Sequence, residues 1–109
     1  VGSDALPVDQ QLTLEVARMI REFFLQQNGF DPVDAYCDIK LQYEMAKAIL
    51  SFQEAAKTAM ADGALLNDVV NVPARSNLMR GRFEDGYLER IEAMVKEMNE
   101  QIANAVEAN

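Results

Sequence analysis

The sequence predicts an all-α protein, an antiparallel helical bundle of three long helices plus a short fourth. Apolar residues recur at steps of three and four along three long stretches, which is the period of one helical face. No stretch of about four to eight residues alternates apolar and polar side chains in the β-branched-rich manner of a strand. Helices with one apolar stripe each bury it against one another. The 109 residues, 50% of them hydrophobic, are predicted to form a single helical domain over residues 1–109.

The first helix is predicted from Asp9 to Gln27. Its apolar residues lie three or four positions apart and are expected to face the core: Leu12, Val16, Met19, Ile20, Phe23 and Phe24. The pair Asn28-Gly29 tolerates the left-handed conformation in which many helices end, and Asp31-Pro32 favours an extended or turn conformation.

A second and longer helix is predicted from Asp38, as N-cap, to a stop at Asp62-Gly63. Its inward residues are expected to be Ile39, Tyr43, Ala46, Ile49, Leu50, Ala56 and Met60. A short helix is then predicted between Ala64 and Val72, ended by Pro73.

A basic stretch after Pro73 is predicted to be the loop of the domain, and it contains Arg75, Arg80, Gly81 and Arg82. The last helix is predicted to begin near Glu84. Its apolar residues follow near-heptad spacing: Leu88, Ile91, Val95, Met98, Ile102 and Ala105.

Composition excludes several classes of function. The chain has 10 Lys and Arg against 18 Asp and Glu, a formal net charge of −8, and no His. Phosphate surfaces need clustered basic residues, so nucleic-acid and anionic-membrane binding are not expected. Without His and with the single Cys37, the chain has no Ser-His-Asp or Cys-His nucleophile and no ordinary zinc site, and no metal site is predicted.

The same inventory bears on compartment and on origin. A lone cysteine forms no internal disulfide, and no secretory signal or membrane span is visible. Cytoplasmic residence is therefore expected. Cys37 is interpreted as structural because no His or cluster of Lys stands beside it to activate the thiol. The first residue is Val1 rather than Met, which suggests a piece or a processed product of a longer protein. The six methionines occupy apolar positions and are expected in the core.

One candidate site lies around the end of the first helix, where residues 21–30 combine three phenylalanines with Gln26, Gln27 and Asn28. The segment has two interpretations. Aromatic clusters are usually core, and Phe30 would then pack back on the helix end. Alternatively, the rings and amides form a platform for a flat heterocycle such as a purine.

Two charged groups are also candidates. Arg75, Arg80 and Arg82 suit fork-like recognition of carboxylate or phosphate, either in internal salt bridges or in an anion site that would serve a small helical enzyme. The last helix is acid-rich at Glu89, Glu92, Glu97 and Glu100, which indicates a solvated face or a surface for a basic partner. No GxxxxGK[ST] phosphate loop is present.

Three blocks of the chain resemble a known family. They are Leu14-Glu15-Val16-Ala17-Arg18-Met19-Ile20-Arg21-Glu22 with Phe24-Leu25-Gln26-Gln27-Asn28-Gly29-Phe30, Val33-Asp34 and Tyr36-Cys37; then Lys40, Gln42-Tyr43, Met45 and Lys47-Ala48-Ile49-Leu50; then Val72-Pro73-Ala74-Arg75. They resemble the C-terminal domain of the catalytic A subunit of archaeal and vacuolar-type rotary ATPases. The FLQQNxF string is the specific part. Phe23, Gly29 and Ala35 depart from the family pattern, which usually has Asp, Ala and Thr there.

The resemblance implies a larger, multidomain parent subunit of an ATP synthase or ATPase coupled to proton or sodium ion transport. This chain would be its C-terminal fragment. A P-loop domain upstream would hold ATP or ADP with Mg and contain the catalytic residues, so the fragment alone is expected to be non-catalytic and to hold no cofactor. Phe30 is implied as the ring that stacks on adenine and Gln26 as its neighbour, with Phe24 as a second wall.

The implied partners are the upstream domain, the B subunits and the central stalk, in a soluble head that is peripheral to the membrane. A different class of function stays open from the residues themselves. A free-standing acidic helical interaction module would use the near-heptad face of the last helix and needs no catalytic group.

Overall fold

The computed structural model describes residues 6–25, 35–80 and 86–107 of the chain, with the side chains at 24, 25 and 35–38 excepted. The elements are α1 (Val8–Leu25), α2 (Ala35–Ala61), α3 (Leu66–Val70), α4 (Pro73–Arg80) and α5 (Tyr87–Glu107), and no strand occurs within these residues. The all-α prediction is confirmed. Two short helices, however, stand between the long ones where the sequence predicts one.

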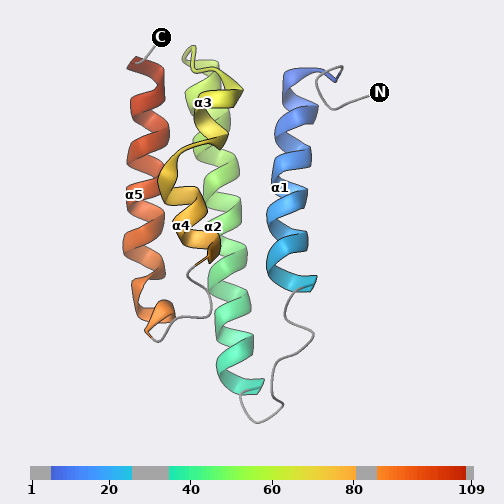
Figure 1. Ribbon diagram of the computed structural model, residues 1–109, viewed down its shortest axis with the longest axis vertical. Coiled ribbons are helices and arrows are strands. Elements are labelled where there is room, and N and C mark those ends of the chain that lie inside the picture. The colour runs from blue at the N-terminus through green and yellow to red at the C-terminus, as the bar shows by residue number, and fades with distance from the viewer. Residues whose placement is uncertain (1–5, 26–34, 81–85, 108–109) are drawn as a thin grey trace.

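The three long helices run along the length of the molecule, whose principal extents are 47 × 33 × 17 Å. Figure 1 shows α1 descending and α2 ascending beside it, and α5 ascends on the other side of α2. Residues 44–51 of α2 lie beside 91–95 of α5, and residues 51–62 lie beside 99–107, so these two helices run in the same direction. The prediction of an antiparallel bundle is wrong for this pair, because α3 and α4 carry the chain back before α5 begins.

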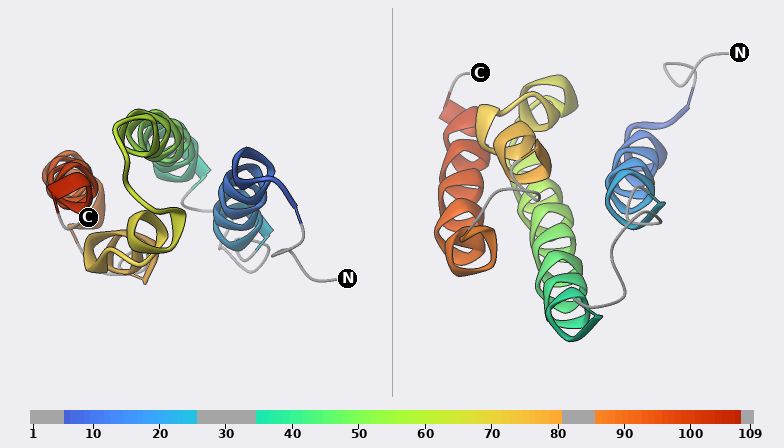
Figure 2. Two further views of the ribbon diagram at one scale, coloured as in Figure 1. Left: turned by 90° about the horizontal axis from the view of Figure 1, so that it is seen from above. Right: turned by 60° about the horizontal axis from the view of Figure 1, so that its bottom comes forward.

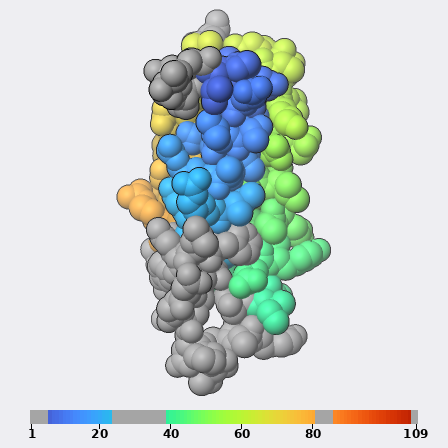
Figure 3. All heavy atoms as spheres, turned by 90° about the vertical axis from the view of Figure 1, so that its right-hand side faces the viewer, coloured from blue at the N-terminus to red at the C-terminus, as the bar shows by residue number. Residues whose placement is uncertain are grey.

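The short helices lie on one side of the long ones. Seen from above in Figure 2, α3 and α4 stand on one side of α2, between α1 and α5, and none of the described helices lies on the opposite side of α2. α1 forms one edge of the molecule, and α2 is visible beside it in the space-filling view of Figure 3.

The core lies where α1, α2 and α5 meet this pair of short helices. Its largest fully buried side chains come from every helix: Phe23, Phe52, Leu12, Met19, Met45, Ile49, Leu78, Met98, Ile102 and Val69. Burying one such side chain stabilises the fold by roughly 1.5–3 kcal/mol. Four of the six methionines are buried and Met60 and Met94 are partly buried, as expected.

The predicted inward faces of α5 and of most of α1 are confirmed. Ile91, Met98, Ile102 and Ala105 are buried, and Leu88 and Val95 are partly buried. In α1, Ile20 is instead 45% exposed.

The predicted face of α2 is wrong at three residues. Ile39, Tyr43 and Leu50 are 68%, 63% and 59% exposed. The predictions for Ile49 and Ala56 are confirmed, and Met60 is partly buried. The buried residues of the helix are Met45, Ala48, Ile49, Phe52, Ala56 and Ala59. Apolar residues therefore occupy two sides of α2, and only one of these sides packs against the other helices.

The ends of the helices also differ in part from the predictions. Asp38 lies inside α2, which already begins at Ala35. The predicted stop at Asp62-Gly63 is confirmed, because α2 ends at Ala61 and Gly63 has φ of 110°, a conformation that glycine adopts without strain. The predicted stop at Asn28-Gly29 and the predicted start at Glu84 lie outside the described residues.

The predicted loop after Pro73 is wrong as far as Arg80, because these residues form α4. Proline is well suited to the first position of a helix, where its missing N–H would have no partner. The N–H of Ala74 donates to Oε1 of Gln101 at 2.8 Å, and the Tyr87 hydroxyl donates to the carbonyl of Leu78 at 2.6 Å. α5 thus satisfies backbone groups near both ends of α4.

Candidate functional site

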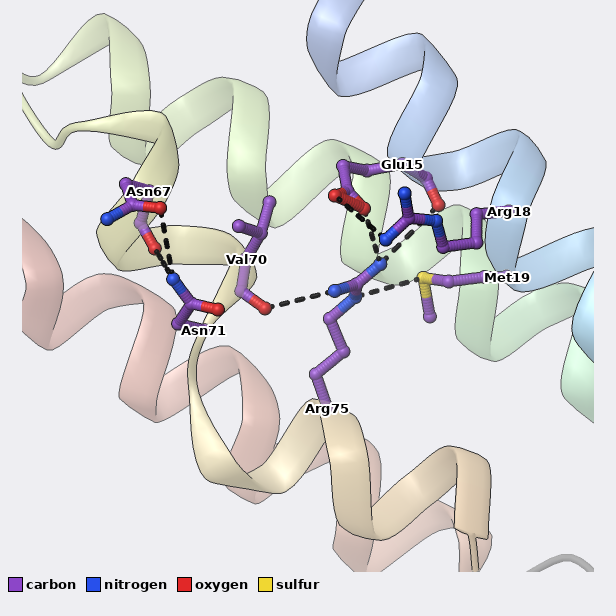
Figure 4. A network of polar contacts seen from close by, with 7 residues as sticks. All are labelled: Glu15, Arg18, Met19, Asn67, Val70, Asn71 and Arg75. Atoms are coloured by element: carbon purple, nitrogen blue, oxygen red, sulfur yellow. Dashed lines mark hydrogen bonds and ion pairs between the residues drawn. The ribbon is translucent and has the colours of Figure 1, made fainter. Parts of the chain in front are cut away.

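Arg75, in the first turn of α4, has the most polar contacts of the side chains that the structure describes. Its Nη1 donates to the carbonyl of Val70 at 3.0 Å, and its Nη2 lies 3.2 Å from Oε2 of Glu15. Nη2 is also 3.5 Å from the backbone oxygen of Glu15, and Nε is 3.5 Å from the sulfur of Met19. Figure 4 shows the guanidinium between α1, which contributes Glu15 and Met19, and the end of α3.

Arg75 also contacts α2, in addition to its contacts with α1 and α3. The guanidinium carbon of Arg75 lies 5.0 Å from the centroid of the fully buried Phe52 ring, within the range of a cation–π contact. The Arg75 and Glu15 side chains are only 15% and 21% exposed. Their ion pair is therefore less screened by solvent than a surface pair, and one arginine joins α1, α2, α3 and α4.

Two further contacts support this arrangement. Arg18 lies 3.8 Å from the other carboxylate oxygen of Glu15, so this carboxylate has two cationic neighbours. At the end of α3, the Asn71 amide donates to the carbonyl of Asn67 at 2.8 Å and contacts its side-chain oxygen at 3.1 Å (Figure 4). This bond satisfies a carbonyl near the end of the short helix that presents Val70 to Arg75.

Of the two interpretations of the arginines, the structure favours internal pairing for Arg75. Arg80, at the end of α4, is exposed, and Arg82 lies outside the described residues. Arg75 is occupied by Glu15 rather than presented to solvent. The anion-site interpretation therefore gains no support from Arg75.

The residues predicted to contact adenine fall mainly outside the described part of the chain. This holds for Gln26 and Phe30, and Phe24 belongs to α1 but its side chain is not among those described. Their placement stays a prediction. Their neighbour Phe23 is fully buried, as its assignment to the core requires.

The remaining candidates from the sequence are the acidic face of the last helix, metal ligands, membrane spans and Cys37. Glu89, Glu92, Glu97 and Glu100 are all exposed on α5, as expected for a solvated face. No group of three or more potential metal ligands occurs among the described residues, and no described helix is long and apolar enough to cross a membrane. The side chain of Cys37 lies outside the described part of the chain.

Two shallow grooves lie between α2 and α5, with volumes of about 540 and 370 Å³. Ser51 borders both, and its hydroxyl accepts a hydrogen bond from the Asn99 amide at 3.0 Å. The Asn99 side-chain oxygen is buried and has no hydrogen-bond partner among the described groups. Neither groove contains the arginine network or a described aromatic ring.

Comparison with known proteins decides the family. A family model described as the C-terminal domain of V and A type ATP synthase matches residues 1–70, which include α1, α2 and α3. The chain belongs to this family. The resemblance carried by the FLQQNxF string and by the block from Lys40 to Leu50, both within the matched residues, is thereby confirmed as a family relationship.

Curated relatives extend the match beyond residue 70. Three of these relatives are A subunits of A-type ATP synthases. The chain is 43% identical over 108 residues to that of Methanospirillum hungatei, 41% over 104 residues to that of Methanosarcina barkeri, and 48% over 87 residues to that of Methanocorpusculum labreanum. These alignments cover 99%, 95% and 80% of the chain. The chain spans 19%, 18% and 15% of the length of these relatives.

Sequence reasoning missed the structural importance of Arg75. The available signal was Pro73, which begins helices as readily as it ends them, followed by the helix formers Ala, Arg, Leu and Met. The partner Glu15 has no sequence signal of this kind, because the pair joins residues 60 positions apart.

Proposed function

We propose that this chain is the C-terminal helical domain of the catalytic A subunit of a V/A-type rotary ATP synthase. The family match carries the proposal, and the small share of each relative that the chain spans supports a larger multidomain parent. That parent would couple ATP synthesis or hydrolysis to proton or sodium ion transport. The Mg-bound nucleotide would lie in an upstream P-loop domain, because this chain has no phosphate loop of its own. The fragment by itself would then be non-catalytic and would hold no cofactor.

The proposed role of the segment after α1 is to close over the adenine of that nucleotide. Phe30 would stack on the base, with Gln26 beside it and Phe24 as a second wall. Aromatic stacking needs neither charge nor metal, and amides can meet the polar edges of a purine. The isolated chain would bind nucleotide weakly, because the triphosphate contacts are absent from it.

The proposed role of the helical body is to transmit motion to the central rotor shaft, in a head peripheral to the membrane that also contains B subunits. A lever must move as a unit rather than absorb displacement. The buried core and the contacts of Arg75 with three other helices support such rigidity.

The adenine contact is tested by Phe30→Ala in the complete parent protein. Loss of a base–aromatic stack should weaken nucleotide affinity by about 1–3 kcal/mol, measured by calorimetric titration with ADP and Mg. Leu65→Ala is the matched control, because Leu65 is a 58% exposed apolar residue between α2 and α3. Equal affinities for wild type and Phe30→Ala would remove the adenine role and leave the family assignment intact.

The parent itself is tested by sequencing the reading frame upstream of Val1. A GxxxxGK[ST] motif a few hundred residues earlier supports the rotary ATP synthase. By contrast, a start codon immediately before Val1 would contradict it and would favour the free-standing acidic helical interaction module.

A further inference from the structure

The two grooves between α2 and α5 adjoin, because Ser51 lines both of them. Together they form a furrow along residues 44–62 of α2 and residues 91–107 of α5, and the described residues that line it come from these two helices alone. Eighteen positions of α2 correspond to about 27 Å, or five turns of helix. Where the grooves meet, the Asn99 amide donates to the Ser51 hydroxyl at 3.0 Å, and this hydrogen bond fixes the spacing of the two walls.

The floor of the α2–α5 furrow is apolar, with small side chains on the α2 wall. Ala48, Ser51 and Ala55 follow one another at steps of three and four, so they lie on the same side of α2. On the α5 wall, Ile102 is buried and Val106 is half-buried. Small residues opposite branched ones leave room for the larger side chains of a third helix, which packs its ridge of side chains into such a groove.

The edges of the furrow are acidic. The lining contains five carboxylates against one ammonium, a net charge of −4. The carboxylates are those of Glu44, Glu54, Asp62, Glu92 and Glu107. The ammonium is that of Lys47, which lies 3.7 Å from the Glu44 carboxylate. The other four carboxylates form no ion pair with the residues that the structure describes.

Residues next to the furrow do not cancel this charge. Residues 44–62 and 91–107, lining and non-lining together, contain seven carboxylates and three lysines, which is again a net charge of −4. Lys57 and Lys96 are the two lysines that do not line the furrow. The furrow therefore favours a cationic partner and disfavours an anionic one such as a nucleic acid or a phospholipid surface.

We propose that the α2–α5 furrow binds an amphipathic helix of a partner protein, whose apolar stripe is flanked by Lys or Arg. The apolar side chains of this helix occupy the space above the small residues of α2, and its basic flanks face Glu54 and Glu107. The proposal goes beyond the nucleotide and rotor roles and does not depend on them.

A second copy of the chain is a poorer occupant than such a partner. Among the described helices α4 alone has a net positive charge, from Arg75 and Arg80. α4 has no large exposed apolar residue, and its Arg75 is paired with Glu15. No described helix of this chain therefore combines an exposed apolar stripe with basic flanks.

Three designed peptides of about five turns test the proposal. Two have the same leucine stripe, flanked by Lys in one and by Glu in the other, and the third has the residues of the Lys-flanked peptide in an order without a stripe. Fluorescence anisotropy would measure their binding to the 109-residue chain at low and physiological salt. We expect the Lys-flanked peptide to bind at least about tenfold more tightly than the other two, with its advantage over the Glu-flanked peptide shrinking as salt rises.

Charge substitutions locate the binding surface. The double variant Glu54→Gln, Glu107→Gln should bind the Lys-flanked peptide at least about fivefold more weakly than the wild type. The matched control is Glu22→Gln, Glu97→Gln, which removes the same charge from exposed residues that do not line the furrow. It should change affinity less than about twofold at physiological salt, because charges more than a Debye length from the peptide are screened.

A steric substitution tests the furrow itself. Ala103→Trp places a large ring in the furrow at an exposed residue of its lining, and it should also weaken binding of the Lys-flanked peptide at least about fivefold. Ala93→Trp is the matched control, because Ala93 is an exposed alanine on α5 that does not line the furrow. Circular dichroism would verify that each variant keeps its helices.

Four outcomes would overturn the proposal. These are no binding of the Lys-flanked peptide, equal binding of any other peptide, equal effects of a variant and its matched control, and concentration-dependent self-association that Ala103→Trp abolishes. The last would assign the furrow to a second copy of the chain. None of the four would affect the family assignment, which rests on the sequence match.

Discussion

At the scale of single residues, Arg75 is the side chain whose removal should affect the fold most through polar contacts. Its alanine variant would leave Glu15 without one of its two cationic neighbours and the Val70 carbonyl without its guanidinium donor. The contact with the Phe52 ring would also be lost. We expect Arg75→Ala to lower the free energy of unfolding by about 2–4 kcal/mol, measured by urea titration.

The exposed Arg80, on the same helix, is the matched control for this prediction. Arg80→Ala should change stability by no more than about 0.5 kcal/mol. Glu15→Gln introduced into the wild type and into Arg75→Ala completes a double-mutant cycle for this pair. A coupling energy near zero between Arg75 and Glu15 would show that the ion pair contributes nothing to stability beyond the separate residues.

Three residues of α2 show that helical spacing alone does not predict which side of a helix is buried. The spacing of Ile39, Tyr43 and Leu50 is helical, and the prediction that they belong to one face is correct in phase. The prediction that these three residues face inward is wrong, because the helix packs through its other side, where Met45 and Phe52 are buried together with the correctly predicted Ile49. Periodicity identifies a stripe but does not identify which of two stripes finds a partner.

At the scale of secondary-structure elements, the short helix α4 is stabilised by hydrogen bonds from α5. An eight-residue helix is too short to be stable alone in water. Its backbone receives support from Gln101 near its start and from the Tyr87 hydroxyl near its end. The sequence pattern around Pro73 is compatible with loop or helix, and these tertiary contacts favour the helix.

Tyr87→Phe tests this support. The substitution keeps the buried ring and removes only the hydroxyl that donates to the Leu78 carbonyl at 2.6 Å. We expect a loss of about 1–2 kcal/mol in the free energy of unfolding, because a buried carbonyl loses this donor. Tyr43→Phe, at a 63% exposed tyrosine, should be close to neutral in the same urea titration. Equal stability of both variants would argue against a role for the Tyr87 hydroxyl.

At the scale of the whole molecule, the net charge of −8 opposes compaction. Carboxylates crowd the outer face of α5 at Glu92, Glu97 and Glu100, where they are exposed and screened by salt. Raising NaCl from about 0.01 to 0.3 M should therefore raise the thermal midpoint by a few degrees, since about 1 kcal/mol corresponds to about 4–8 °C in a domain of this size. Scanning calorimetry would measure the shift.

Neutralising these carboxylates should reproduce the effect of salt. The triple variant Glu92→Gln, Glu97→Gln, Glu100→Gln should have the higher midpoint at low salt and a smaller dependence on NaCl. A midpoint that falls with NaCl in the wild type would mean that favourable ion pairs such as Arg75–Glu15 outweigh the repulsion.

The sequence by itself determined the helical class, the three long helices, the stop at Gly63, the buried face of α5 and the family, through the FLQQNxF string and the blocks that follow. These features depend on local periodicity, on residue-specific backbone preferences and on a motif, all of which are written along the chain. The adenine contact at Gln26 and Phe30 is implied by the family resemblance, and it stays a prediction because those residues lie outside the described part of the chain.

Only the tertiary structure decided that α2 and α5 run in the same direction, that residues 73–80 are helical, that Arg75 pairs with Glu15, and that the apolar stripe of Ile39, Tyr43 and Leu50 stays exposed. Each of these depends on groups far apart in the sequence. Their energies arise from packing and from pairing of polar groups across helices, and such terms have no counterpart in the local pattern of residues.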